Sequence, residues 1–152
     1  MLTVPLVAIG LANALAFVSL GGALYEFRVV DPFWPHRPEI IQPERGGISR
    51  RRFWIPAHVA FELTLIVALI TAWAQRGMRT WLLVGLVSHA SMRLWSALDF
   101  IPKALAFERA EPAAIPADAA AGWTWRSRWR LPLDLVTCGA MLTAFAAAVR
   151  LG

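Results

Sequence analysis

Ionisable side chains lie inside long apolar segments of this chain, where charged groups would normally be absent. These residues are His58, Glu62, His89, Arg93, Asp99 and Asp134. A charge in hydrocarbon is costly, so residues of this kind usually face a protein interior and mark a binding site or a proton relay. Their number and clustering predict a buried polar site between apolar helices.

In the third apolar segment the polar residues share one helix face. At about 100° per residue, His89, Arg93, Ser96, Asp99 and Lys103 fall on a stripe about 120° wide. The remaining surface is mostly Leu and Ala, which suits contact with lipid or with other helices. The pattern predicts a helix with one face turned toward the interior.

Depth along the helices suggests which charges pair. Counted from the predicted cytoplasmic ends at about 1.5 Å per residue, Glu62 lies at about 13 Å and Arg93 at about 15 Å. We therefore predict a Glu62–Arg93 ion pair near the middle of the membrane. On the same count His89 lies about two turns deeper than His58. A shallower layer is expected to contain His58, Asp99, Asp134, Tyr25 and Glu26.

These residue types suit general acid–base chemistry. His58 and Glu62 are four residues apart and share a helix face, and a histidine near a carboxylate in a dry cavity can transfer protons. Arg93 would stabilise a developing oxyanion, while His89 and Asp99 would tune the pair. The residues expected to bind substrate are Tyr25, Glu26, Asn13, Trp95 and Asp134.

A metal site is an alternative use of the same side chains. His58, Glu62 and His89 could ligate zinc or non-haem iron, and the two histidines could hold haem. The paired Glu-x-x-His motif of di-iron bundles is absent, and we expect no cofactor. Polar groups can also serve only to hold helices in register, so a purely structural role is a further alternative.

Four apolar segments must position these side chains. The chain has 152 residues, of which 58% are hydrophobic and only 16% are charged. The apolar runs at 3–26, 53–74, 81–103 and 131–149 each approach or exceed the length that spans a bilayer. The first run could be a signal peptide, but it lacks a basic n-region. We predict an all-α fold: a single domain, residues 1–152, built as a four-helix transmembrane bundle.

The connecting segments predict how the bundle is oriented. Four prolines exclude a regular helix from residues 28–52, which we expect to cap the bundle end. Alternating Trp and Arg before the last span predict a short interfacial helix. Most basic residues lie in these two segments, which places them in the cytoplasm and both termini outside, in the plasma (inner) membrane. Charge that flanks apolar spans does not predict nucleic-acid binding.

Three short stretches carry a family resemblance. They are GGALYE at residues 21–26 with the proline-rich loop after it, RLW at 93–95, and DFIP at 99–102. In these features the chain resembles the small four-helix membrane proteins of the anthrone-oxygenase-like family. The resemblance implies oxidation of polycyclic phenolic substrates by oxygen without an evident cofactor.

The sequence thus predicts a membrane-embedded enzyme that acts on a small lipophilic molecule by acid–base chemistry, as an oxygenase or an isomerase. One alternative is a non-catalytic accessory subunit or binding protein of a larger membrane complex. Another is a small proton-coupled transporter, which with four helices would need to form a homodimer. The expected partners are a lipophilic small molecule and membrane lipid.

Overall fold

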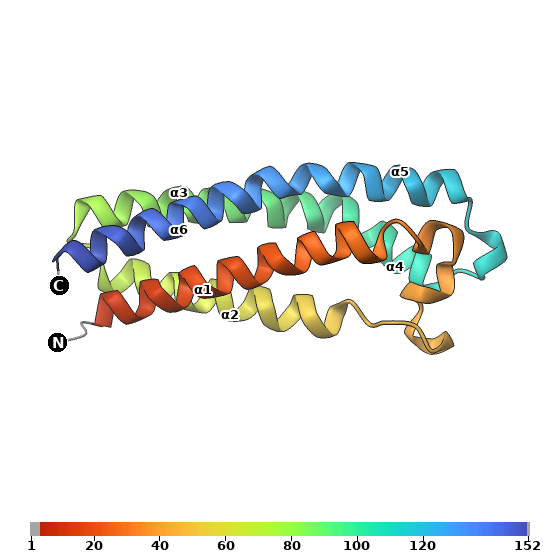
Figure 1. The fold of residues 1–152 in the computed structure, drawn as a ribbon, viewed down its shortest axis with the longest axis horizontal. Coiled ribbons are helices and arrows are strands. Elements are labelled where there is room, and N and C mark those ends of the chain that lie inside the picture. The colour runs from red at the N-terminus through yellow and green to blue at the C-terminus, as the bar shows by residue number, and fades with distance from the viewer. Residues whose placement is uncertain (1–3, 152) are drawn as a thin grey trace.

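A computed structural model describes residues 4–151 and shows an all-helical protein, with no strand in that range. The long helices are α1 (Val4–Tyr25), α2 (Arg51–Thr71), α3 (Arg76–Trp95) and α6 (Leu131–Leu151). They run alternately up and down, so the link at 72–75 and both chain ends lie at one end of the bundle (Figure 1). The segments 31–50 and 110–116 lie at the other end (Figure 1). The predicted first residue of the first span, Thr3, lies outside the described residues.

The third helix continues well past its predicted end at residue 103. A π-helical turn, η5 (Ser96–Phe100), follows α3 and leads directly into α4 (Ile101–Arg109). Pro102 lies in the first turn of α4, where a missing N–H breaks no helical hydrogen bond. The proline therefore marks a change of helix geometry and not the end of the helical path.

The segment before α6 contains a helix that is nearly collinear with α6. α5 (Ala117–Ser127) runs through a 3-10 turn, η7 (Arg128–Arg130), into α6 along nearly the same line (Figure 1). Ser127 and Leu131, on either side of that turn, both keep right-handed helical backbone angles, so the axis is not broken. α5 consequently extends the fourth helix beyond the start of α2 instead of crossing the bundle end.

The main apolar core lies along the bundle axis. α6 packs along both α1 and α3, and α1 packs along α2, whereas α2 and α3 have the least contact of these neighbours. Small buried residues let α1 and α6 approach closely: Ala8, Ala12, Ala16, Ala140, Ala144 and Ala148. The α2 and α3 backbones lie farther apart than those of the other neighbours, and larger side chains such as Phe61, Leu65 and Leu82 are buried there.

A second apolar cluster closes the loop end. The segment 31–50 forms three 3-10 helices, η2 (Trp34–His36), η3 (Pro38–Ile41) and η4 (Pro43–Arg45). Trp34 is fully buried there against Phe100 and Trp123. Gln42 Nε2 donates to the carbonyl oxygens of Phe107 at 2.9 Å and Ala110 at 2.8 Å. The loop is thus packed onto α4 and α5.

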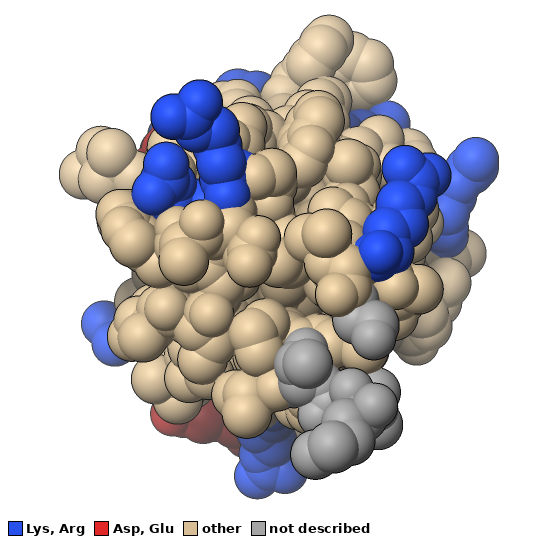
Figure 2. All heavy atoms as spheres, turned by 90° about the vertical axis from the view of Figure 1, so that its left-hand side faces the viewer, with Lys and Arg blue, Asp and Glu red and all other residues tan. Residues whose placement is uncertain are grey.

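Three helical stretches are long and apolar enough to cross a membrane: Val4–Val30, Arg51–Thr71 and Ala117–Leu151. The helix α3 is not among them, because Arg76 and Arg79 near its start, together with His89 and Arg93, lower its mean hydropathy. The end of the bundle that holds the termini is mostly uncharged surface with separate Lys and Arg groups near its margin (Figure 2).

We expect Gly47→Ala to destabilise the loop end. A Cβ at this position would lie 2.7 Å from the carbonyl oxygen of Ile40 and closer still to that of Glu39. Both are backbone atoms that cannot swing away, so the expected loss is about 2 kcal/mol. The melting temperature in a nonionic detergent measures it. The control is Gly77→Ala in the first turn of α3, where a Cβ would meet none of the described residues within 4 Å. Equal melting temperatures for the two variants would contradict the prediction.

Candidate functional site

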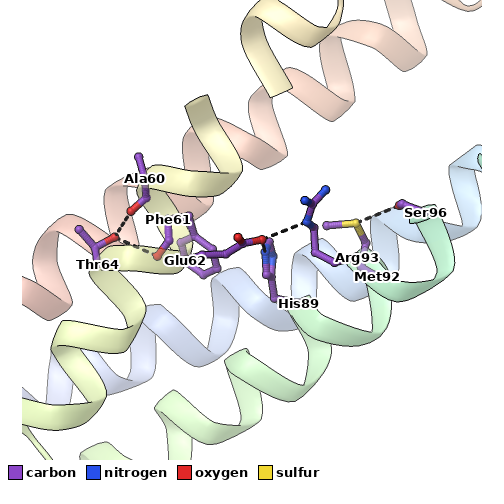
Figure 3. Close-up of polar contacts among 8 residues, drawn as sticks. All are labelled: Ala60, Phe61, Glu62, Thr64, His89, Met92, Arg93 and Ser96. Carbon is purple, nitrogen blue, oxygen red and sulfur yellow. Dashed lines mark hydrogen bonds and ion pairs between the residues drawn. The ribbon is translucent and has the colours of Figure 1, made fainter. Parts of the chain in front are cut away.

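One carboxylate joins the second and third helices. Arg93 Nε donates to Glu62 Oε1 at 3.0 Å, and His89 Nε2 lies 3.2 Å from the same oxygen (Figure 3). A carboxylate only accepts, so His89 carries a proton on Nε2 in this arrangement. His89 and Arg93 are four residues apart on α3 and reach the same partner on α2. The predicted Glu62–Arg93 pair is confirmed, and His89 shares it.

His58 connects this pair to the first helix. Its ring stacks on Trp54, with centroids 5.2 Å apart and planes 19° apart, and lies 5.5 Å from the ring of His89. Trp54 Nε1 donates to Glu26 Oε1 at 2.8 Å. His58 is buried, and its Nδ1 has no hydrogen-bond partner among residues 4–151. A continuous row of polar and aromatic groups therefore runs from α1 to α3.

The predicted depth of His89 was wrong, because it lies at the same level as His58. The count assumed that the cytoplasmic ends of α2 and of the third helix are level. His58 is seven residues into α2, or about 10 Å. Seven residues from His89 toward the loop end is Ser96, which is therefore level with the start of α2. The path from there to Arg109 projects beyond the start of α2.

This offset also separates several predicted site residues from His58. Asp99 pairs with Lys103 at 2.5 Å and with Arg126 of α5, and it does not line the cavity described below. Tyr25 and Trp95 are 59% and 37% exposed and also lie outside the cavity. Asn13 is half-buried on α1, away from these groups. The predicted shallow layer is therefore divided between two places.

A cavity of about 310 Å³ lies at the loop end of the bundle. It is bounded by the end of α1, the start of α2, the path from α3 to α4, and the junction of η7 with α6. Four of the predicted site residues line it: His58, Arg93, Glu26 and Asp134. Glu62 and His89 lie behind it and hold Arg93 and His58 in place.

Several lining residues were missed by sequence reasoning. They are Trp54, Asp31, Arg50, Trp123, Arg128 and Arg130. Trp54 precedes His58 by four residues, so the same spacing that linked His58 to Glu62 could have found it. Arg50 and Arg130 were interpreted only as topology signals, because their distance in sequence gives no hint that they meet.

The metal alternative finds no ligand cluster in the part of the chain that the structure describes. No group of three or more His, Cys, Asp or Glu side chains in residues 4–151 is placed to hold a metal ion. Of the suggested ligands His58, Glu62 and His89, the carboxylate is already engaged by Arg93. His36 is exposed in the loop and lies apart from them.

Comparison of the chain with family models, with curated proteins and with solved structures found no match. The resemblance of residues 21–26 and 93–102 to the anthrone-oxygenase-like family stays an expectation. What the site can do must follow from the side chains that line its cavity.

We expect Glu62 and Arg93 to be energetically coupled. Removing one partner, as in Glu62→Gln or Arg93→Gln, leaves the other charge unpaired and half-buried between two helices, so each variant should melt at a lower temperature. The double variant should lose less than the two single losses combined, with a coupling of about 1–2 kcal/mol. Glu44→Gln, at an exposed position in η4, is the control. Strictly additive losses would contradict the prediction.

We expect Asp31 to make stability depend on pH. Burial, and then the neighbouring Glu26, raise the pKa of Asp31 from 3.8 to about 6 although Trp34 Nε1 donates to it at 3.2 Å. The folded protein therefore binds this proton more tightly than the unfolded chain, and the stabilisation is lost as pH rises from about 4 through 6. Asp31→Asn should raise stability by about 3 kcal/mol at pH 8 and change little at pH 4. Thermal unfolding in detergent at both pH values is the test, and an equal effect at both would contradict it.

Proposed function

We propose that all four long helices cross a membrane. Three meet the length and hydropathy that a span requires, and large apolar side chains face outward on the bundle, for example Leu63, Ile70 and Val87, each at least 60% exposed. Such a surface on an isolated soluble domain would be an aggregation hazard. The fourth span, α3, would be tolerated because Arg93 and His89 are paired with Glu62 and are not left alone in lipid.

The proposed orientation puts the loop end in the cytoplasm of a plasma (inner) membrane. The segments 28–52 and 103–130 carry most of the basic residues, whereas the opposite end has Arg76, Arg79 and Arg150. The positive-inside rule places the richer side in the cytoplasm. The α5 helix and the cap formed by 31–50 would then lie in the headgroup zone and the adjoining water.

We further propose that the protein is an enzyme that moves a proton on a small lipophilic substrate. The observation that carries this proposal is the position of His58, whose ring lines the cavity between Trp54 and His89 and whose Nδ1 has no partner within the described chain. Nδ1 itself is buried, so the ring would turn toward the cavity before this nitrogen accepts a proton from a bound molecule. Arg93 lines the same cavity and would stabilise the oxyanion that proton removal creates.

The reaction is an enolisation or its phenolic counterpart. His58 Nδ1 takes a proton from a carbon next to a carbonyl or an electron-poor ring, and the electron pair moves onto the oxygen beside Arg93. Return of the proton to a different carbon completes an isomerisation. Reaction of the same carbanion with oxygen would be the oxygenation that the family resemblance implies. Glu62 does not line the cavity, so its proposed role is to position Arg93 and His89.

The substrate would enter between α2 and α3. The backbones of these helices make few close approaches, and apolar residues of α2 and of the following α4 line the cavity: Ile55, Val59, Ile101 and Leu105. A lipophilic molecule could therefore pass from the bilayer to His58 without crossing the cytoplasmic cap.

Incorporation of deuterium from D₂O into a lipid molecule tests this function, with a lipid extract as the source of candidate substrates. The purified protein is incubated in D₂O with a total lipid extract, and mass spectrometry follows a species that gains one deuterium. His58→Gln should slow this exchange at least about 100-fold, the usual contribution of a general base. His36→Gln, at an exposed histidine outside the cavity, should leave it unchanged. Full exchange in a folded His58→Gln variant would contradict the assignment. No exchange at all, with a stoichiometric protein partner co-purifying, would favour an accessory subunit.

A further inference from the structure

One end of the cavity is unusually rich in guanidinium groups. Five arginines line it together with four carboxyl groups. Arg93 is paired with Glu62, and Arg51 lies 3.3 Å from Glu108. The remaining three, Arg50, Arg128 and Arg130, have no close carboxylate among the described residues; the nearest approach is 4.0 Å, between Arg50 and Glu108.

Arg50 is the most deeply buried of the three. Its side chain is 7% exposed, and its Nη2 has no hydrogen-bond partner within residues 4–151. Its guanidinium carbon lies 5.2 Å from the ring of Trp123 and 5.8 Å from that of Trp34. Aromatic faces attract the cation but cannot accept in the plane of its N–H groups. A buried cationic donor is thus held beside the cavity with its hydrogen-bonding capacity unmet.

Arg128 and Arg130 approach the same cavity from the opposite side. The guanidinium carbon of Arg130 lies 4.6 Å from the ring of Phe100, and its Nη1 donates to Ser96 Oγ at 3.0 Å. That of Arg128 lies 4.4 Å from the ring of Phe27, and its buried Nε has no partner in the described chain. All three guanidinium groups thus lie against aromatic rings and not against carboxylates.

Four carboxyl groups share the cavity with these arginines. Glu26 accepts from Trp54 and Asp31 accepts from Trp34, both neutral indoles that leave the carboxylate charge in place. Glu108 Oε2 lies 3.3 Å from Arg51 but has no hydrogen-bond partner within residues 4–151. Asp134, in the first turn of α6, is the remaining acid on this wall. Arg50 Nη2 and Arg128 Nε therefore remain without an acceptor among residues 4–151, although Glu26, Asp31 and Asp134 share the cavity with the three arginines.

We propose that this end of the cavity binds the phosphate group of an amphiphile, with its apolar part lying between α2 and α3. A phosphate monoester carries a charge of about −1.5 to −2 and several acceptor oxygens, which suits three guanidinium groups better than a single carboxylate would. The inference rests on the proposed function and names its substrate class. It places the headgroup at the loop end and the chain beside His58, in the orientation that a lipid of the cytoplasmic leaflet would have.

Binding of a simple phosphate amphiphile tests the site. The full chain, purified in dodecyl maltoside, is titrated with dodecyl phosphate by native mass spectrometry and calorimetry. We expect one dodecyl phosphate per chain and at least tenfold weaker binding for Arg50→Gln and for Arg130→Gln. Arg52→Gln is the matched control, because Arg52 is exposed two residues from Arg50 and does not line the cavity. An equal loss in Arg52→Gln would indicate general surface charge and overturn the site.

Two further ligands distinguish the contribution of the phosphate group to binding from that of the alkyl chain. Dodecanol that binds as tightly as dodecyl phosphate would overturn the phosphate site, and inorganic phosphate that binds as tightly would overturn the amphiphile. Arg50→Lys guards against misfolding, because it keeps the positive charge but lacks the planar guanidinium group. The folded Arg50→Lys variant should bind dodecyl phosphate more weakly than the native protein does and more tightly than Arg50→Gln does. Binding to Arg50→Lys no tighter than to Arg50→Gln would count against recognition by charge.

The test also distinguishes this inference from the proposed catalysis. His58→Gln should bind dodecyl phosphate with unchanged affinity while it loses deuterium exchange. If Arg50→Gln and Arg130→Gln bind normally, the phosphate site is overturned and the role of His58 is untouched. If His58→Gln exchanges normally and the arginine variants bind weakly, the proposed catalysis fails and the phosphate site stands.

Discussion

The site depends on one pair of hydrogen bonds: Arg93 and His89 both donate to the same carboxylate oxygen of Glu62. This carboxylate joins α2 to α3 at the boundary where neighbouring helices make the fewest close backbone contacts. Because both donors lie on one face of α3, the Glu62 carboxylate holds that face toward α2. His89 is thereby placed beside His58, and Arg93 is brought to the wall of the cavity.

The cavity exists because the structure has two apolar cores and a polar belt between them. One core runs along the bundle, and the other lies at the loop end around Trp34, Phe100 and Trp123. The longer third and fourth helices extend past the start of α2, and the proline-rich loop fills the space beside them. The charged and aromatic groups that line the cavity lie at the loop end of the bundle.

Sequence patterns predicted the elements and faces well and the axial positions poorly. The apolar runs located α1, α2, α3 and α6, and the matched depths of Glu62 and Arg93 predicted their pair. The same counting misplaced His89 and grouped Asp99 with His58, because it took the helix ends as level. A π-helical turn and a proline inside a continuous helical path left no signal in composition that would have moved the end from residue 103 to Arg109.

The sequence by itself determined which residues share a face, because helical periodicity is a local property of the backbone. It could therefore place His58, Glu62 and Trp54 on one stripe of α2, four residues apart. Only the tertiary structure decided how far one helix slides past another, since that offset comes from packing against α1, α6 and the capping loop. The meeting of Arg50 with Arg128 and Arg130 around one cavity belongs to that second kind of information, because these side chains come from segments far apart in the chain.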